Sequence, residues 1–337
     1  MNLVTGATGI LGSHVLLRLL LNGQPVIALK RSDSDIEKVK DLFAFYTPDH
    51  KQLFAKINWV ELDVLDVYGM EQVVKDAAVV YHCAGYVSFD PADRKKLFRI
   101  NEQGTANVVN ACLHHNVDAL CHASTIGTIS NSDVQELTEA VFWKRSGNES
   151  DYALSKYNAE REVWRGIEEG LNAVIVNPGV IVAPVFWDQS SGKIFRNCAK
   201  GNRFYTSGSS AYITAMDAAK AMILLVNGRH FANRYILAEN NYDLRTIFSR
   251  IQINLGKSAP HIKVGKKALY LASGLERFSS IFTKKPPVLT KSLINSAFNR
   301  QIYSNSKVTN TLNTSFTPVL EALDEICAYY QTVSTGS

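Results

Sequence analysis

The chain has 337 residues, 46% of them hydrophobic, and is long enough to bury a large core without disulfides. Its formal net charge of +5 is spread along the chain without a long basic block, which argues against nucleic acid as a partner. No apolar stretch reaches the roughly 18 residues that a membrane span needs, and a strand follows Met1 directly, so we expect neither a span nor a signal peptide. Five cysteines, an odd number, favour a reducing compartment, and we expect a cytoplasmic protein.

The first half of the chain alternates short β-rich runs with helical periods, which is typical of a parallel sheet wrapped by helices. We expect six β units in right-handed succession. The predicted strands are 2–4, 25–29, 57–61, 79–83, 119–123 and 173–176, and the predicted helices are 10–22, 36–46, 70–75, 101–115 and 151–169. After Pro178 the alternation decays, and only 217–226 and 319–330 keep a helical pattern.

A glycine-rich run, TGATGILG over residues 5–12, separates the first strand from the first helix, where the pyrophosphate of a dinucleotide would rest. Gly6 permits the tight turn, Gly9 lacks the Cβ that would block a phosphate, and Gly12 lets the helix pack close to the sheet. This position after a strand and before a helix favours dinucleotide binding over an ordinary turn. The cofactor contacts predicted in this run are Gly6, Thr8, Gly9, Ile10 and Leu11.

The choice of cofactor is made at the end of the second strand, about 20 residues beyond the glycines, where an acidic side chain would bind the ribose of NAD. This chain has Lys30 and Arg31 there. Two cations can pair with a 2′-phosphate but offer a 2′-hydroxyl no acceptor, so NADP(H) is favoured over NAD(H). In the alternative, Lys30 and Arg31 are solvated and Asp33 or Asp35 binds the ribose.

These features predict an α/β fold, a doubly wound parallel Rossmann sheet with a smaller C-terminal substrate-binding part. We expect residues 1–178 and 211–238 to form the NADP-binding domain. Residues 179–210 and 239–337 would form the substrate-binding domain.

A Tyr/Lys pair opens the long helical segment that begins near residue 151. The i, i+4 spacing of Tyr152 and Lys156 puts phenol and ammonium on one face, and a nearby ammonium should lower the tyrosine pKa from about 10. Ser124 and Thr125 follow the fifth strand at its carboxyl end, the edge where open α/β folds bind ligands. A hydroxyl there can donate to the same substrate oxygen as the phenol.

With these motifs the chain resembles the extended short-chain dehydrogenase/reductase superfamily over nearly its whole length. The resemblance also includes VYHCAG at 80–85, NEQGTAN at 101–107, HAST at 122–125, and the runs 177–184 and 212–217. It implies that Thr125 is the catalytic Ser/Thr, that Tyr152 is the acid/base, and that Lys156 holds the nicotinamide ribose. The further cofactor contacts that it implies are Asp63 near the adenine, Val64, Ala84, Gly85, Asn101, and Pro178 with Val180 beside the nicotinamide.

One position separates branches of this superfamily. Many nucleotide-sugar epimerases and dehydratases carry an Asn where this chain has the apolar Val180, which offers a sugar-nucleotide phosphate no hydrogen bond. The chain therefore resembles most the branch of dihydroflavonol reductases and 3β-hydroxysteroid dehydrogenases, and Arg31 resembles their 2′-phosphate contact. Ser130 departs from the residue with which plant flavonoid reductases commonly read the substrate ring, so flavonoid specificity is not implied.

The leading hypothesis is an NAD(P)H-dependent reductase that reduces a ketone or aldehyde of a hydrophobic small molecule. In it, a hydride reaches the carbonyl carbon while Tyr152 protonates the oxygen and Thr125 hydrogen-bonds it. Two alternatives stay open: a nucleotide-sugar epimerase or dehydratase that uses bound NAD, and a non-catalytic nucleotide-binding redox sensor.

Other patterns point to partners. The eight histidines show no HExxH or paired Cys/His spacing, so we expect no metal site, and His114 and His115 should end a helix where a cation suits the macrodipole. The helices at 101–115 and 151–169 resemble those that pair superfamily dimers, which makes a homodimer an expectation. Aromatic residues in predicted loops are candidates to line an apolar substrate pocket. These are Tyr86, Phe89, Phe142, Trp143, Phe186, Trp187, Phe204 and Tyr205.

Overall fold

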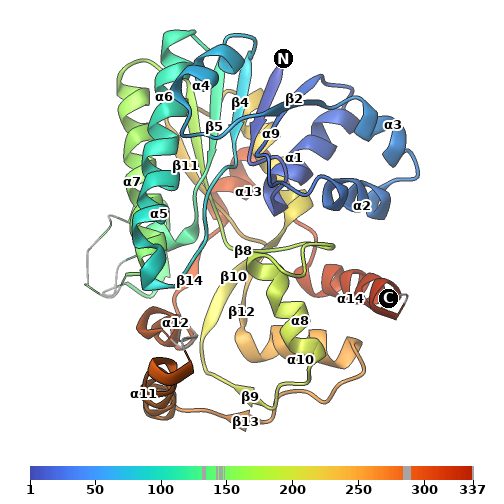
Figure 1. The fold of residues 1–337 in the computed structure, drawn as a ribbon, viewed down its shortest axis with the longest axis vertical. Helices are drawn as coiled ribbons and strands as arrows, with labels where there is room; N and C mark the ends of the chain where they lie inside the picture. Colours follow the sequence, from blue (N-terminus) through green and yellow to red (C-terminus); the bar gives the residue numbers. More distant parts are fainter. Residues whose placement is uncertain (131–133, 142, 144–146, 148, 284–289, 336–337) are drawn as a thin grey trace.

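The main body of the protein is a seven-stranded parallel sheet in the order β11-β7-β5-β4-β1-β2-β3 (Figure 1). The computed structural model describes residues 1–130, 134–141, 143, 147, 149–283 and 290–335. The strands are β1 (Asn2–Thr5), β2 (Val26–Lys30), β3 (Asn58–Glu61), β4 (Val79–His82), β5 (Ala119–Ala123), β7 (Ala173–Pro178) and β11 (Asn233–Leu237). The predicted α/β fold with a doubly wound parallel sheet is confirmed.

Helices cover both faces of this sheet, so successive residues of its strands enter two separate cores. Leu3 and Val80 pack on one face, whereas Val4 and Tyr81 pack on the other. The first core is closed by α4 (Val67–Val74), α6 (Gly104–His114) and α7 (Asp151–Glu168). The second is closed by α1 (Ile10–Leu21), α2 (Glu37–Tyr46), α3 (His50–Ala55), α9 (Ala215–Asn227) and α13 (Ser306–Leu312).

The six predicted strands are all present, but the structure adds β11 as a seventh, paired with β7. The run NRYIL that forms β11 begins with two polar residues, which leaves too short an apolar pattern to read as a strand. The helix predicted over 101–115 is divided into a π-helix (Arg99–Gln103) and α6. It continues α5 (Arg94–Phe98), which follows a 3₁₀ turn (Pro91–Asp93).

The smaller part of the molecule is built on the three-stranded sheet β12-β10-β8. Its strands are β8 (Val180–Val182), β10 (Ser209–Thr214) and β12 (Asn240–Asp243), and its core helices are α8 (Lys193–Ala199), α10 (Leu244–Asn254) and α14 (Val319–Thr335). Further elements are β6 (Glu136–Leu137) with β14 (Ile302–Tyr303), β9 (Phe204–Tyr205) with β13 (Ile262–Lys263), α11 (Lys266–Thr283), α12 (Lys291–Ser296) and 3₁₀ turns at Ile126–Thr128 and Ser190–Gly192.

The chain crosses between the two parts more than once. β10 is the middle strand of the smaller sheet, where it pairs with β8 and β12. The chain then returns to the main body through α9 and β11. The division at residues 178, 210 and 238 stays a prediction. In the part of the chain that the structure describes, no helix is both long enough and apolar enough to cross a membrane.

Candidate active site

The glycine loop after β1 leaves space for a ligand at one glycine and is filled by the protein at the other two. Gly6 has φ +63°, and a Cβ there would lie 2.6 Å from the Ala84 backbone; a Cβ on Gly12 would lie 2.2 Å from the Gly6 carbonyl oxygen. The fold itself therefore requires these two glycines. A Cβ on Gly9 would meet only the Gly6 oxygen, at 3.3 Å.

The N-terminus of α1 faces this loop with its first amides uncapped by any side chain, since Gly9 is the N-cap and no acidic residue lies in the first turn. Such a terminus is a ready site for an anion. The loop and the N-terminus of α1 therefore fit the pyrophosphate of a dinucleotide.

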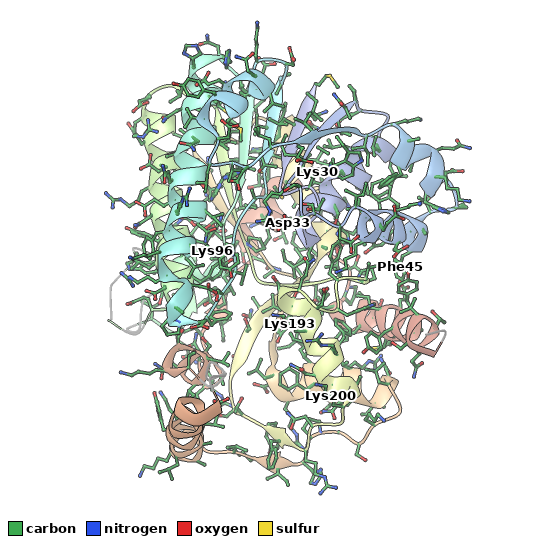
Figure 2. The ribbon with its side chains drawn as sticks, viewed as in Figure 1. Lys30, Asp33, Phe45, Lys96, Lys193 and Lys200 are labelled. Carbon is green, nitrogen blue, oxygen red and sulfur yellow. The ribbon has the colours of Figure 1, made fainter. Side chains whose placement is uncertain are left out.

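The two cations predicted to select the cofactor are the last residue of β2, Lys30, and the residue that follows it, Arg31. Figure 2 shows Lys30 and the nearby Asp33 at the end of β2 that faces the smaller part of the molecule. Lys30 Nζ lies 3.3 Å from Glu61, and Arg31 Nε lies 3.1 Å from Asp33. Thr8 donates to Ser34 Oγ at 3.3 Å, and Ser34 Oγ also accepts from the Arg31 amide, so the glycine loop and this turn are tied together. Each cation therefore has a carboxylate partner that a 2′-phosphate would have to replace.

Two residues predicted to lie near the adenine and in the adjoining loop have local partners. The Asp63 carboxylate accepts from the Leu65 amide at 2.9 Å, and the Val64 carbonyl accepts from Asn107 at 3.0 Å. Val64 also packs against Gly104, where a Cβ would lie 2.8 Å from its methyl carbon. Val64 thus docks α6 on the sheet, and Asp63 shapes the turn before α4.

Asn101 joins the loop after β4 to α7. It is fully buried in the π-helix, accepts from the Tyr86 amide at 2.7 Å, and donates to the Tyr86 carbonyl at 3.0 Å and to Ser155 Oγ at 2.9 Å. Ala84, in the same loop, donates from its amide to Thr5 at 3.1 Å. This loop carries Gly85, where a Cβ would meet nothing closer than the Asn101 oxygen at 3.4 Å.

The structure brings the three predicted catalytic residues to the carboxyl end of β5. Thr125 caps the 3₁₀ turn 126–128 by accepting from the Gly127 amide, and its side chain is close enough to the Tyr152 phenol to lower the phenol's pKa. Ser150 caps α7 by accepting from the Ala153 amide, which puts Tyr152 in the first turn of that helix. The Phe89 ring meets the Tyr152 ring edge to face at 6.1 Å.

The predicted direction of the Tyr152 pKa shift is not what the structure gives. Burial raises it to about 12, and the hydrogen bond from Thr125 opposes this only in part, so the expectation that Lys156 lowers it is wrong for this structure. Lys156 is 3% exposed, and its ammonium donates to the Ala123 carbonyl at 2.7 Å, at the end of β5. Burial lowers the Lys156 pKa to about 8, against the favourable charge of Glu160.

Two buried polar residues beside this pair, His122 and Glu160, were not predicted from the sequence. His122 Nε2 lies 3.4 Å from Lys156 Nζ. Glu160 accepts from Thr128 at 2.5 Å and from Asn177 at 2.6 Å, with Arg234 3.8 Å away. The sequence could have indicated Glu160, because it lies one turn after Lys156 on the face of α7 that packs on the sheet. His122 had no such signal beyond its place in the HAST run.

The segment predicted to border the nicotinamide links the two parts of the molecule. Pro178 ends β7, and a Cβ on Gly179 would lie 2.4 Å from the Ala211 carbonyl oxygen, so the chain passes very close to β10 here. Val180 begins β8 opposite Tyr212. The predicted contacts of Pro178 and Val180 with a cofactor stay predictions.

A cavity of about 200 Å³ lies next to the first turn of α7, between the loop after β4 and α12. Phe89, Pro91, Ser150 and Lys291 are among the residues that line it. Of the eight aromatic candidates, Phe89 lines this cavity and Phe142 lies outside the described residues. The other six have different surroundings: Phe186 is buried in the core, Trp187 packs on Phe195 and Tyr330, Trp143 stacks on Tyr157, Tyr86 bonds Asp93, Tyr205 lies under Arg245, and Phe204 is exposed.

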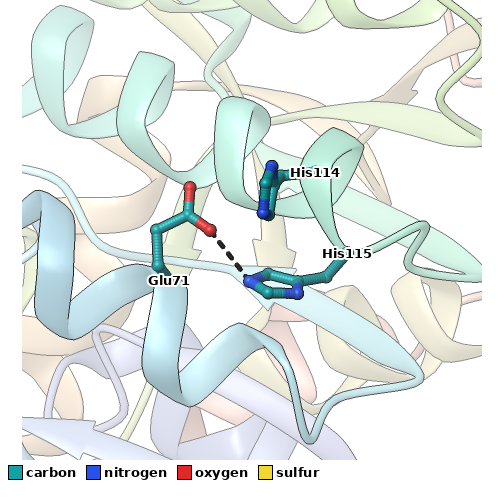
Figure 3. A group of neighbouring side chains, drawn as sticks. All are labelled: Glu71, His114 and His115. Atoms are coloured by element: carbon teal, nitrogen blue, oxygen red, sulfur yellow. Dashed lines mark ion pairs between the residues drawn. The ribbon is translucent and has the colours of Figure 1, made fainter.

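The described residues include one group with metal-ligand chemistry, Glu71, His114 and His115 (Figure 3). His115 Nε2 lies 2.8 Å from the Glu71 carboxylate, and both histidines lie at the C-terminal end of α6, as predicted. The predicted catalytic residues lie by the opposite end of that helix, which Asn101 precedes. An ion pair at a helix C-terminus accounts for the group, and the expectation of no metal stays a prediction.

Comparison with known proteins identifies several relatives of the chain. It is 27% identical over 266 residues to a protein named putative dihydroflavonol 4-reductase from Synechocystis, which covers 76% of this chain and 73% of that one. It is 25% identical over 268 residues to sterol demethylase protein B from Methylococcus capsulatus, covering 78% and 76%. The crystal structure of gox2253 superposes with a TM-score of 0.81 over 98% of both chains, at 24% identity.

The sequence model of the NAD dependent epimerase/dehydratase family matches residues 2–236, which span the glycine loop, the Thr125, Tyr152 and Lys156 cluster, and nearly all of β11. This is more than half of the chain. The protein is therefore a member of the NAD-dependent epimerase/dehydratase family, an enzyme family that binds a nicotinamide cofactor.

Proposed function

We propose that the protein is an NADP(H)-dependent reductase that converts a ketone or aldehyde of a hydrophobic small molecule into the alcohol. The observation that carries this proposal is the cluster at the end of β5, where Thr125 lies by the Tyr152 phenol and Lys156 lies one turn further along α7. A relative named as a reductase and the apolar Val180 support reduction over sugar-nucleotide chemistry.

In this proposal the bound nicotinamide supplies the hydride, and the chain supplies position and a proton. The glycine loop and the N-terminus of α1 bind the pyrophosphate. Two of the three N–H groups of Lys156 reach acceptors in the described part of the chain, Ala123 and His122, so the third is available to a ribose hydroxyl.

Tyr152 acts as the acid. With its pKa raised to about 12, the phenol is protonated at neutral pH, so it donates to the developing alkoxide. Thr125 hydrogen-bonds the same oxygen. A protonated phenol is the state from which reduction of a carbonyl begins.

The preference for NADP(H) rests on the exposed pairs of Lys30 with Glu61 and Arg31 with Asp33. Exposed ion pairs contribute about 0–1 kcal/mol, whereas a phosphate offers a charge-assisted, bidentate partner to arginine. A 2′-phosphate can therefore displace Asp33 from Arg31 at small cost.

The remaining predictions belong to the same proposal. Residues 1–178 and 211–238 would bind the cofactor, and 179–210 and 239–337 would shape the substrate site. The outward helices α6 and α7 would form a homodimer. Cytoplasmic location agrees with the five cysteines, all of them free thiols.

The test is a panel of ketones and aldehydes assayed by NADPH oxidation, together with the dissociation constants of NADPH and NADH. We expect turnover with at least one apolar carbonyl compound and tighter binding of NADPH. Copurifying NAD with binding of a UDP- or dTDP-sugar would instead support an epimerase or dehydratase. Nucleotide binding without turnover in either assay would support a redox sensor.

A further inference from the structure

His122 is a buried histidine on β5 that takes no direct part in the proposed transfer of hydride and proton. Its side chain is fully buried, and its neighbours across the sheet are His82 on β4 and Ile175 on β7. Nε2 lies 3.4 Å from the Lys156 ammonium, and Nδ1 has no hydrogen-bond partner among the described residues. A buried polar atom left without a partner is rare and calls for a physical reason.

The neighbouring His82 shows what a fully bonded histidine in this layer looks like. Thr105 donates its hydroxyl proton to the Asn101 carbonyl at 2.6 Å, so its oxygen accepts from His82 Nε2 at 3.0 Å. His82 Nδ1 then accepts from Thr5 at 2.7 Å. Both nitrogens of His82 are used and its tautomer is fixed with the proton on Nε2.

His122 must carry its proton on the other nitrogen. An ammonium has no lone pair, so Lys156 can only donate, and His122 Nε2 can only accept. The proton of the neutral ring is therefore on Nδ1, the atom without a partner. Burial and the charge of Lys156 hold the His122 pKa well below its usual value, so the ring is neutral.

The charged groups around Lys156 leave His122 as one of its two direct acceptors in the described part of the chain. Glu160 lies one turn further along α7 and favours the ammonium by its charge, but its Oε1 is occupied by Thr128 and Asn177. From the β4 side the site is faced by the Cys83 thiol and by His82, which is neutral. The other direct acceptor is the Ala123 carbonyl.

We propose that His122 is a positioning residue for Lys156: its Nε2 accepts a hydrogen bond from the ammonium and holds it, still charged, at the carboxyl end of β5. In this arrangement the ring proton is on Nδ1, for which the described residues offer no acceptor, so the contact with Lys156 is the hydrogen bond that they give the ring. The role in catalysis rests on the proposed function, but the hydrogen bond itself does not.

An acceptor for the charged form raises the pKa of the group that donates to it. Without His122, Lys156 would keep only the Ala123 carbonyl and would lose its proton at lower pH. The ammonium would then also be less well placed for the cofactor ribose.

The hydrogen bond is tested first by long-range ¹⁵N–¹H spectra of the histidine rings in the intact protein near pH 7. We expect Nδ1 of His122 and Nε2 of His82 to carry the proton, and the His122 Nε2 signal to move in Lys156→Met. A proton on His122 Nε2, or an unchanged signal in Lys156→Met, would overturn the proposal whether or not the protein reduces a carbonyl.

The catalytic part is tested by the pH dependence of kcat/KM in two variants. His122→Phe keeps a ring but removes the acceptor, and we expect the alkaline limb to fall by about one pH unit and the KM for NADPH to rise. His122→Gln places an amide oxygen near the position of Nε2 and should restore most of the profile. Identical profiles for wild type and His122→Phe would contradict the proposal; if His122→Phe does not fold, the spectra and His122→Gln still decide it.

Discussion

Two regions at the same edge of the sheet differ in how far their charged side chains are exposed to water. At the ends of β4 and β5, the polar groups Lys156, Glu160 and His122 are buried, and short hydrogen bonds hold Lys156 and Glu160 in place. At the end of β2, Arg31 and Asp33 form an ion pair whose side chains are 53% and 71% exposed. The ammonium of Lys156, which is removed from water, has a lowered pKa and a fixed position, whereas exposed charges can exchange partners.

This difference in exposure gives the two regions different roles in the proposed function. The buried region sets protonation states, which is where acid catalysis needs control. In the proposed function the exposed region binds the adenosine end of the cofactor, where selection depends on which anionic partner Arg31 prefers. Substitutions should therefore change rate and stability in the first region and cofactor affinity in the second.

The largest effect is expected in the buried region at Tyr152. Tyr152→Phe keeps the ring that packs against Phe89 and removes the proton, so kcat should fall by about 10²- to 10⁴-fold. The dissociation constant of NADPH, measured by fluorescence titration, should change little. Turnover at the wild-type rate would remove Tyr152 from the mechanism.

The pH dependence of the reduction should follow Lys156. Because its pKa is lowered to about 8, the ammonium proposed to hold the ribose is present below that pH and lost above it, while Tyr152 stays protonated. The value of kcat/KM should fall about tenfold per pH unit above pH 8, to about a tenth by pH 9. A profile that stays flat to pH 10 would show that the charge of Lys156 is not needed.

The same lysine should make stability depend on pH. A lysine with a lowered folded-state pKa binds fewer protons in the folded than in the unfolded protein between pH 8 and 10.5, so the free energy of unfolding rises with pH in that range. Relative to Lys156→Met, the wild type should gain about 2 kcal/mol between pH 7 and 9.5 in urea titrations. Equal pH slopes for the two proteins would contradict burial of the charge.

A matched control replaces a lysine of the exposed region, Lys30, by methionine. Lys30 pairs with Glu61 at the end of β2, where the side chains are 25% and 59% exposed. Lys30→Met should change the free energy of unfolding by less than about 1 kcal/mol. A larger change would mean that the two regions differ less than their exposure indicates.

What the sequence predicted, and what it missed, follows the same division. The glycine loop, the six strands and the Tyr152/Lys156 spacing are local patterns, readable from neighbouring residues. The contacts of His122 with Lys156 and of Asn177 with Glu160 join residues 34 and 17 positions apart, on elements whose pairing only the fold determines. The direction of the Tyr152 pKa shift was wrong for the same reason, since burial is a property of the packed molecule.

The smallest effects are expected in the exposed region, where they separate the two cofactor hypotheses. Arg31→Ala should weaken NADPH binding about tenfold and leave NADH binding nearly unchanged, because a charge-assisted bond to the 2′-phosphate is lost. Asp33→Asn is the sharper variant, since it removes the carboxylate that Arg31 now pairs with. If Arg31 binds a 2′-phosphate, Asp33→Asn should tighten NADPH binding severalfold. If Asp33 instead accepts the ribose hydroxyls of NAD, the same variant should weaken NADH binding and leave NADPH binding unimproved, and the preference for NADP(H) would then be wrong.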